Sequence, residues 1–261
     1  MQADFFAKKR RNSLGFLLIL SVITFGAIVI TEYNVVKGFE SLPRAVTWAL
    51  GNFYPTQESL SRLPAILKSL METLLVSIAA TTIGAIFALF FAVMGSNTTR
   101  VNAFFGSISR GIATVFRNID VAAWAMILLF SFGQSSLTGY FALFFGSFGF
   151  LTRAFVETID EASSGSVEAL RATGASYFTI ISQSVIPSSV PQMISWILFM
   201  IETNIRSATL IGLLTGSGIG FTFNLYYKSL NYDIASLVVV TIIIAILFIE
   251  SISNYVRRVI L

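Results

Sequence analysis

Residues 163–187 read SSGSVEALRATGASYFTIISQSVIP, a polar stretch rich in small residues that lies between long apolar runs. Ala, Leu, Glu and Arg are favourable inside helices, so the stretch predicts a first helix that reaches Thr173. Gly174 suits the left-handed conformation that ends a helix. A second helical run is expected from Ser176 to Pro187, where the missing N–H of proline should end it. A bent helix pair with so little side-chain bulk indicates a docking surface for a partner protein.

The composition of the whole chain is that of an integral membrane protein. The 261 residues are 55% hydrophobic and only 11% charged, with a mean hydropathy of +0.81. Several apolar runs reach the roughly 20 residues that a helix needs to cross a bilayer, and strand-like alternation is absent. The predicted fold class is therefore an all-α integral membrane protein within a lipid bilayer.

Cysteine and histidine are both missing from the sequence. Their absence excludes disulfides, thiolate metal sites and a cysteine nucleophile, and it removes the commonest general base. We therefore expect no catalytic residue, no metal site and no cofactor bound by this chain. The net charge of +4 comes from basic residues beside apolar spans, which favours a topology signal over nucleic-acid binding.

The N-terminal part predicts one anchored span followed by an external region. Residues 1–13 carry a basic cluster and form a cytoplasmic N-terminal segment under the positive-inside rule. Residues 14–30 are the first transmembrane helix, interpreted as a retained anchor because no small-residue cleavage site ends the run. Residues 31–68 are external or interfacial, with one short amphipathic helix near residues 42–50. Residues 69–261 form the core of the protein.

The core is predicted to contribute five more spans, so that six cross the membrane. Residues 121–132 are too short to cross alone and must extend back through Asp120 and Arg117. The other spans are expected at residues 74–94, at 136–159, from near Pro191, and at 234–249, with a broken or re-entrant external segment at 213–233. Basic residues flank both termini, so both termini should be cytoplasmic and the number of spans should be even.

Charged residues inside the predicted fifth span are candidates for a transport path. A charge at the bilayer centre costs about 2.5–3.5 kcal/mol, so such residues pair with one another or line a pathway. Glu202 and Arg206 are four residues apart and share one helix face. They either neutralise each other or, together with Asn204 and Ser207, line a path for an anion.

Two other regions carry polar or flexible residues with more than one interpretation. Arg117 and Asp120 either pair or contact a substrate, and Glu72 is expected at a helix end or interface. The run Gly216–Gly220 lacks the spacing and the Lys-Ser/Thr of a phosphate-binding loop, and no strand precedes it. Tight backbone packing or a gate is expected there.

The opening stretch resembles the "EAA" loop of ABC importer permeases, which reads Glu-Ala-Ala, three residues, Gly, nine residues and Ile-x-Leu-Pro. Glu168, Gly174 and Pro187 keep that spacing. The departures are Leu170, Ser184 and Ile186. Residues 202–212 and 216–220 are similar to the fifth-helix signature of the phosphonate/phosphite class of these permeases. Shorter matches lie at residues 53–55, 72–74 and 117–119, although the family usually has proline where this chain has Asp120.

The resemblance implies the type I ABC importer permease fold and a permease that takes up phosphonate, phosphite or phosphate by alternating access. Its implied partners are a second copy of the chain, two cytoplasmic ATPase subunits that bind ATP and Mg, and an external substrate-binding protein. Its implied location is the cytoplasmic membrane of a prokaryote. The residues implied to contact the ATPase are Glu168, Ala169, Leu170, Arg171, Ala172, Gly174 and Ala175.

Two other classes of function are considered beside the importer. A gradient-driven secondary transporter or channel would use Glu202 and Asp120 as proton or ion sites. A membrane enzyme is disfavoured because histidine and cysteine are missing and no external carboxylates cluster.

Overall fold

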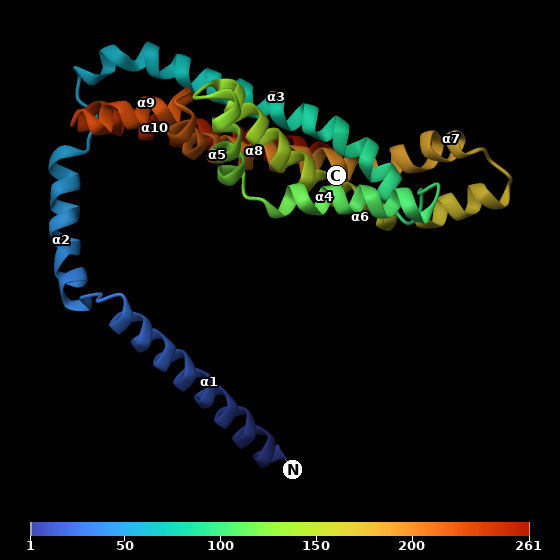
Figure 1. Cartoon of the computed structure of the whole chain (residues 1–261), viewed down its shortest axis with the longest axis horizontal. Coiled ribbons are helices and arrows are strands. Elements are labelled where there is room, and N and C mark those ends of the chain that lie inside the picture. Colours follow the sequence, from blue (N-terminus) through green and yellow to red (C-terminus); the bar gives the residue numbers. More distant parts are fainter. Residues whose placement is uncertain (1, 261) are drawn as a thin grey trace. The chain divides into compact units, whose positions relative to one another are not determined.

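The computed structural model describes residues 2–260, with side chains described for residues 9–163 and 165–260. Every regular element in that part of the chain is a helix (Figure 1). The predicted segments 1–13 and 69–261 each include one terminal residue outside this description. The chain divides into two compact units, Met1–Tyr54 and Pro55–Leu261, and each is described by itself.

The first unit consists of α1 (Gln2–Ile30) and α2 (Val35–Asn52). Residues 9–30 of α1 are long and apolar enough to cross a membrane. α2 is amphipathic, and the side chain of Asn34 caps it by accepting a hydrogen bond from the Lys37 amide at 2.9 Å. The predicted amphipathic helix is therefore present, and it begins earlier than expected because Asn34 is a strong N-cap.

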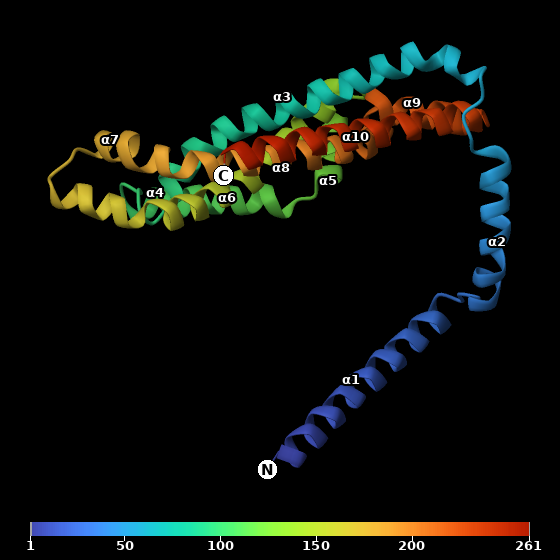
Figure 2. The same ribbon diagram turned by 180° about the vertical axis from the view of Figure 1, so that it is seen from behind.

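The second unit is a bundle of long helices with shorter helices at its two ends (Figures 1 and 2). In both views α3, α6, α8 and α10 run side by side, with α7 at one end and α9 toward the other. Its elements are η1 (Ser59–Arg62), α3 (Leu63–Gly95), α4 (Ala103–Asn118), α5 (Val121–Phe132), α6 (Ser136–Ala172), α7 (Tyr177–Ile180), η2 (Ile181–Val185), α8 (Ile186–Thr215), α9 (Gly218–Lys228) and α10 (Tyr232–Ile260).

Five helices in the described chain are long and apolar enough to cross a membrane, or up to six if the bent pair α4 and α5 counts as one span. The predicted third span is wrong in one respect, because no continuous helix runs through Arg117 and Asp120. The two helices meet at an angle of 90°. Asp120 instead caps α5, with its carboxylate accepting a hydrogen bond from the Ala122 amide at 2.8 Å.

The predicted stop at Pro187 and the predicted start of the fifth span near Pro191 are both wrong. The chain stays helical from Tyr177 to Thr215, because a π-helical turn, η2, leads directly into α8. Pro187 lies in the first turn of α8, where a missing N–H is tolerated, and Pro191 lies inside the helix. The wider π turn absorbs the irregularity that a proline introduces.

α6 is the central helix of the second unit, and it packs against α3, α4, α5 and α8. It is longer than the predicted span because it continues to Ala172 without a break. Glycines let its neighbours approach closely. A Cβ on Gly149 would lie only 2.5 Å from the Arg117 backbone nitrogen, so α4 crosses α6 in direct contact at this point.

The glycine-rich run between α8 and α9 is a close backbone contact. Gly216 has φ +67° and ends α8 in the left-handed conformation. A Cβ on Gly220 would lie 1.9 Å from the Thr209 carbonyl oxygen, so only glycine fits there. The predicted tight backbone packing of residues 216–220 is confirmed. The broken segment expected at 213–233 contains the short helix α9.

Candidate functional site

Residues 163–187 form a helical hairpin, called the hairpin below, at one end of the bundle. Its first arm is the end of α6 and its second arm is α7 with η2. Gly174 has φ +77° at the bend, and Ser176 caps α7 by accepting a hydrogen bond from the Thr179 amide at 3.3 Å. The predicted helix, glycine bend and helix is confirmed.

The two arms of the hairpin are fixed to each other and to the bundle. Val167, Ile180 and Val185 are buried in the largest apolar cluster. The hydroxyls of Ser166 and Ser184 lie 2.7 Å apart and join the two arms. The hairpin is therefore a firm projection of α6 and α8.

The residues predicted to contact an ATPase divide into two groups. The exposed ones are Glu168, Ala169, Arg171, Ala172 and Gly174. Leu170 and Ala175 instead pack against the apolar cluster. Sequence reasoning missed Phe178, which is 82% exposed beyond the bend. The signal in the sequence was a pair of aromatic residues, Tyr177 and Phe178, shortly after the glycine bend.

Beside the hairpin, the loop between α3 and α4 is held by one carboxylate and one guanidinium. Asp160 of α6 accepts hydrogen bonds from the Ser96 hydroxyl at 2.5 Å and from the Thr98 amide at 3.0 Å. Arg171 of the hairpin donates to the Thr98 carbonyl oxygen at 2.6 Å. A displacement of the hairpin would therefore act directly on this loop.

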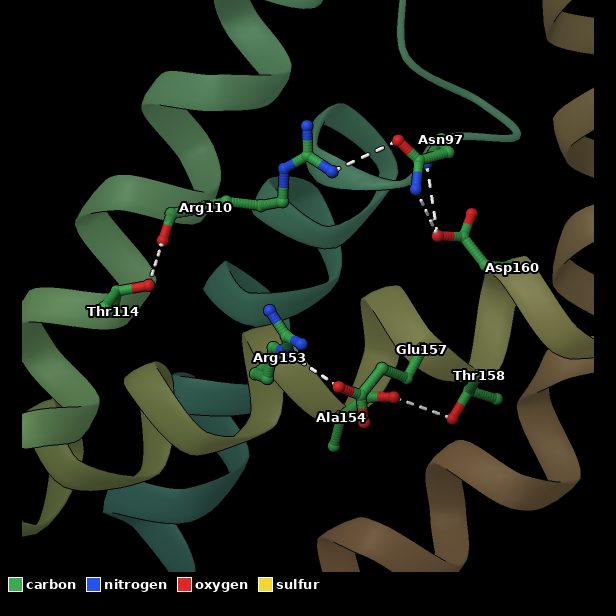
Figure 3. A network of polar contacts seen from close by, with 8 residues as sticks. All are labelled: Asn97, Arg110, Thr114, Arg153, Ala154, Glu157, Thr158 and Asp160. Carbon is green, nitrogen blue, oxygen red and sulfur yellow. Dashed lines mark hydrogen bonds and ion pairs between the residues drawn. The ribbon is translucent and has the colours of Figure 1, made fainter.

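The same loop also connects to α4 (Figure 3). The Asn97 amide nitrogens donate to Asp160, and the Asn97 side-chain oxygen accepts a hydrogen bond from Arg110 at 3.1 Å. Nearby on α6, Arg153 and Glu157 form an ion pair at 2.6 Å. Figure 3 shows Arg110 on α4 and Arg153 on α6, the two helices that cross here.

The charges on α8 form what we call the α8 charge cluster, which consists of Glu202, Arg206 and Arg257. Glu202 and Arg206 form an ion pair at 2.6 Å, so the predicted common helix face is confirmed. Arg257 of α10 lies 3.6 Å from the other carboxylate oxygen. The Glu202 side chain is 12% exposed, whereas the Arg206 side chain is 50% exposed. Sequence spacing could not show Arg257, because its contact crosses between helices.

Asn204 is fully buried between three helices. Its amide nitrogen donates to the Thr81 hydroxyl of α3 at 2.7 Å and to the Ser147 hydroxyl of α6 at 2.6 Å. Ser207 on the same helix is partly buried. Within the single subunit, Asn204 therefore joins α8 to two neighbouring helices.

Three of the polar residues considered lie on other helices. Arg117 and Asp120 are exposed at the bend between α4 and α5. Asp120 acts as a helix cap, and the Arg117 side chain has no hydrogen bond or ion pair with the residues whose side chains are described, 9–163 and 165–260. Glu72 of α3 accepts a hydrogen bond from the Ser136 hydroxyl of α6, which places it at a helix interface as expected. In the described part of the chain, no group of three acidic, histidine or cysteine side chains is placed to hold a metal ion.

Comparisons with known proteins agree on one family. Residues 84–260 match the family described as "Binding-protein-dependent transport system inner membrane component". The chain is 28% identical over 98% of its length, and over 89% of the relative, to the "Putative phosphite transport system permease protein HtxC" of Stutzerimonas stutzeri.

Two further relatives are similar over shorter stretches. The "Phosphate-import permease protein PhnE" of Mycolicibacterium smegmatis is 29% identical over 73% of this chain and 36% of the relative. The "Phosphite transport system permease protein PtxC" of Stutzerimonas stutzeri is 26% identical over 74% of this chain and 70% of the relative.

Solved structures show the same fold at low sequence identity. An inward-facing crystal form of the MetNI methionine ABC transporter superimposes with a TM-score of 0.67 at 19% identity, covering 75% of this chain and 96% of that chain. An amino acid ABC transporter gives a TM-score of 0.65 at 16% identity, covering 76% of this chain and 95% of that chain. The predicted all-α, type I ABC importer permease fold is confirmed.

Proposed function

Because the chain belongs to the family of binding-protein-dependent transport system inner membrane components, it is the membrane permease subunit of such an importer, and we propose that its cargo is a phosphorus oxyanion. The observation that carries the proposal is the similarity to a phosphite permease over 98% of the chain. An arginine without a partner at the α4–α5 bend supports an anionic cargo, since a membrane protein rarely keeps an unbalanced charge without use.

The assembly that fits this cargo contains two copies of the chain, two ATPase subunits and an external binding protein. ATP and Mg belong to the ATPase subunits, and the chain supplies the passage by alternating access. Both termini and the hairpin lie on the cytoplasmic side of a prokaryotic cell membrane in this arrangement. The exposed polar and aromatic residues of the hairpin support an ATPase contact at that end.

The hairpin transmits movement from the ATPase in two ways. Its first arm is continuous with α6, so a tilt of the arm tilts a helix that packs against α3, α4, α5 and α8. Arg171 also holds the Thr98 carbonyl oxygen, so the α3–α4 loop follows the same displacement. Of the residues implied from the sequence, the exposed Glu168, Ala169, Arg171, Ala172 and Gly174 make the ATPase contact, and we add Phe178. Leu170 and Ala175 support that surface from its packed side.

The cargo path passes residues of two helical regions. Arg117 and Asp120 contribute at the α4–α5 bend, and Glu202, Asn204, Arg206 and Ser207 contribute from α8. The exposure of Arg117 and Arg206 supports a direct contact with cargo. Asn204 is buried in the subunit as described, so it reaches cargo only when α8 separates from α3 and α6.

The test of the proposed function is ATPase activity of the reconstituted complex. The chain is combined with its ATPase and binding protein in liposomes, and phosphonate, phosphite and phosphate are added in turn. We expect at least one of them to stimulate ATP hydrolysis and to accumulate inside the vesicles. Stimulation by none of them removes the cargo assignment, and accumulation that needs an ion gradient instead of ATP supports a secondary transporter.

A charge reversal on the hairpin tests its contact with the ATPase. Glu168→Lys should abolish cargo-stimulated ATP hydrolysis or release the ATPase subunits, because an exposed contact charge is inverted. Glu161→Lys is the matched control, since Glu161 is also exposed and lies two turns earlier on the same helix. Equal stimulation in the two variants would contradict the docking role of the hairpin.

A further inference from the structure

α4 and α6 enclose a pocket in which three arginines meet, called the arginine pocket below. It has about 350 Å³ of space, which includes the part open to solvent. Its polar lining is Arg110, Thr114, Arg117 and Asn118 from α4, with Thr152 and Arg153 from α6. On α4 these residues follow helical spacing, so they share one face.

The arginine pocket has more positive charge than its surroundings neutralise. Arg153 is paired with Glu157 at 2.6 Å, whereas the Arg117 side chain has neither a hydrogen bond nor an ion pair among residues 9–163 and 165–260. Arg110 donates to the neutral Asn97 amide and not to a carboxylate. The nearby Asp160 carboxylate is occupied by the loop at residues 96–98. Counted with both nearby carboxylates, Glu157 and Asp160, the three guanidinium groups leave a net charge of +1, and in the described residues neither Arg110 nor Arg117 has a carboxylate within ion-pair distance.

The arginine pocket lies along the apolar part of α6, toward its hairpin end. Arg153 belongs to the candidate span Ser136–Ser163, and α6 continues beyond that span to Ala172. Arg117 lies deeper, because its backbone contacts α6 at Gly149. Arg153 is nevertheless 50% exposed in the single subunit. Exposed guanidinium groups at this depth require water or a partner protein in front of them.

We propose that Arg110, Arg117 and Arg153 form a binding site for a tetrahedral oxyanion on the cargo path, in a water-filled space between two copies of the chain. This inference rests on the proposed function and adds to it a location for the cargo. Guanidinium groups present several N–H donors in a planar fork, which suits phosphate-like oxygens. The site lies on the hairpin side of the membrane centre, so cargo reaches it late in its passage.

A chain of hydrogen bonds joins the arginine pocket to the hairpin. Arg171 donates a hydrogen bond to the Thr98 carbonyl oxygen, and Arg110 donates one to the side-chain oxygen of the adjacent Asn97. The Asp160 carboxylate accepts hydrogen bonds from the backbone amides of both loop residues. When the ATPases move the hairpin, the loop moves with it and Arg110 changes its position relative to Arg117 and Arg153. Movement of the hairpin therefore changes the affinity of the pocket for its anion at the step where cargo leaves.

Direct binding of inorganic phosphate to the full chain tests the site. The fluorescence of Trp124 is the readout, because Trp124 stacks on Phe116, beside Arg117, with ring centroids 5.3 Å apart. The other two tryptophans, Trp48 and Trp196, are replaced by phenylalanine. Phosphate and methylphosphonate are titrated into the protein in phosphatidylcholine nanodiscs, with chloride at equal ionic strength as the blank. We expect saturable binding of both anions.

Variants locate the binding within the bundle. Arg117→Gln and Arg153→Gln should each weaken phosphate binding about tenfold, the effect of one hydrogen bond to a charged group. Arg117→Lys should fall between these variants and the parent, because it keeps the charge without the fork. Arg258→Gln is the control, since Arg258 is exposed and outside the pocket. Unchanged affinity in the two glutamine variants, or no saturable binding by the parent protein, overturns the inference.

A second arm separates free oxyanions from lipid headgroups. Phosphatidylglycerol replaces about a third of the phosphatidylcholine while the ionic strength is held high, so that surface charge is screened. Unchanged phosphate affinity supports a site for cargo. The opposite result has two parts: phosphate binding is lost, and the parent chain retains anionic lipid that the Arg117→Gln variant releases. That result overturns the cargo assignment in favour of a lipid site.

The inference and the proposed function fail in different experiments. If the reconstituted complex transports none of the phosphorus oxyanions, the proposed function is wrong even where phosphate binds the chain. If the complex transports them and the Arg117→Gln, Arg153→Gln double variant transports equally well, the arginine pocket is not on the path and the proposed function stands.

Discussion

The bundle carries two groups of arginines that differ in how their charge is balanced. In the α8 charge cluster, Arg206 and Arg257 both lie within 4 Å of the Glu202 carboxylate. In the arginine pocket, only Arg153 has a carboxylate partner. Every arginine of the first group lies within 4 Å of a carboxylate, whereas two arginines of the second group need water or an anion beside them in a membrane.

The difference shows which charges point to cargo. An ion pair within one helix lowers the cost of inserting that helix into the membrane. Its presence therefore needs no role in transport. In the described part of the chain, Arg110 and Arg117 have no carboxylate partner, so N–H groups remain free to bind a ligand. The path through this permease is therefore expected to depend more on α4 and α6 than on α8.

The largest effect is expected when the arginine pocket is given a carboxylate of its own. Thr114→Glu places an acid three residues before Arg117 and four after Arg110, so it can pair with both. Transport of phosphate or phosphonate should fall about tenfold, because one charge-assisted interaction with cargo is replaced. Thr114→Gln has nearly the same shape without the charge and should transport almost normally. Equal losses in the two variants would show that shape, and not charge, explains the effect.

A smaller effect is expected in the α8 charge cluster. Arg206→Gln leaves Glu202 paired with Arg257, so the cluster changes from a net charge of +1 to a neutral pair. Initial rates of uptake should fall about threefold, the size of a partly exposed charge contact. Uptake kinetics in proteoliposomes measure this change. A loss larger than that of Thr114→Glu would reverse the comparison and place the main cargo contact on α8.

The smallest effect on transport is expected at the neutral polar centre of the bundle, where the change is in stability. Asn204→Ala removes two hydrogen bonds between helices, to Thr81 and Ser147. Such bonds contribute about 0.6 kcal/mol each on average in membrane proteins, so a loss of about 1 kcal/mol is expected. Thermal unfolding of the purified chain measures it. A stability equal to that of the parent would contradict the joining role described for Asn204.

Local sequence signals were enough to predict the hairpin. Gly174 and Ser176 act through the conformation of their own backbone and through neighbouring amides, so their effect does not depend on the rest of the fold. The bend at Asp120 has the same kind of signal, an N-cap residue before an apolar run, and it was missed because the length needed for a span was given more weight.

Contacts between distant parts of the chain could not be predicted in the same way. Arg257 joins Glu202, and Arg153 comes beside Arg110 and Arg117, only because of how the helices pack. Spacing along one helix shows the pair of Glu202 and Arg206 but says nothing of partners on other helices. The arginine pocket was therefore visible in the sequence only as Arg117, one of its three arginines.

Water access to the arginine pocket is the decisive measurement for an anion path along α4 and α6. The chain has no cysteine, so single cysteines can be introduced without background in this subunit. Thr114→Cys is placed in the pocket, and Ile244→Cys is placed on the exposed apolar surface of α10, where Ile244 is 61% exposed. The rate of labelling of the chain by a charged, membrane-impermeant thiol reagent is measured in the reconstituted complex, with reagent on both sides. We expect that Thr114→Cys is labelled, that phosphate slows this labelling, and that Ile244→Cys is not labelled. Absence of labelling at position 114, or labelling that phosphate does not slow, would contradict a water-filled anion path along α4 and α6.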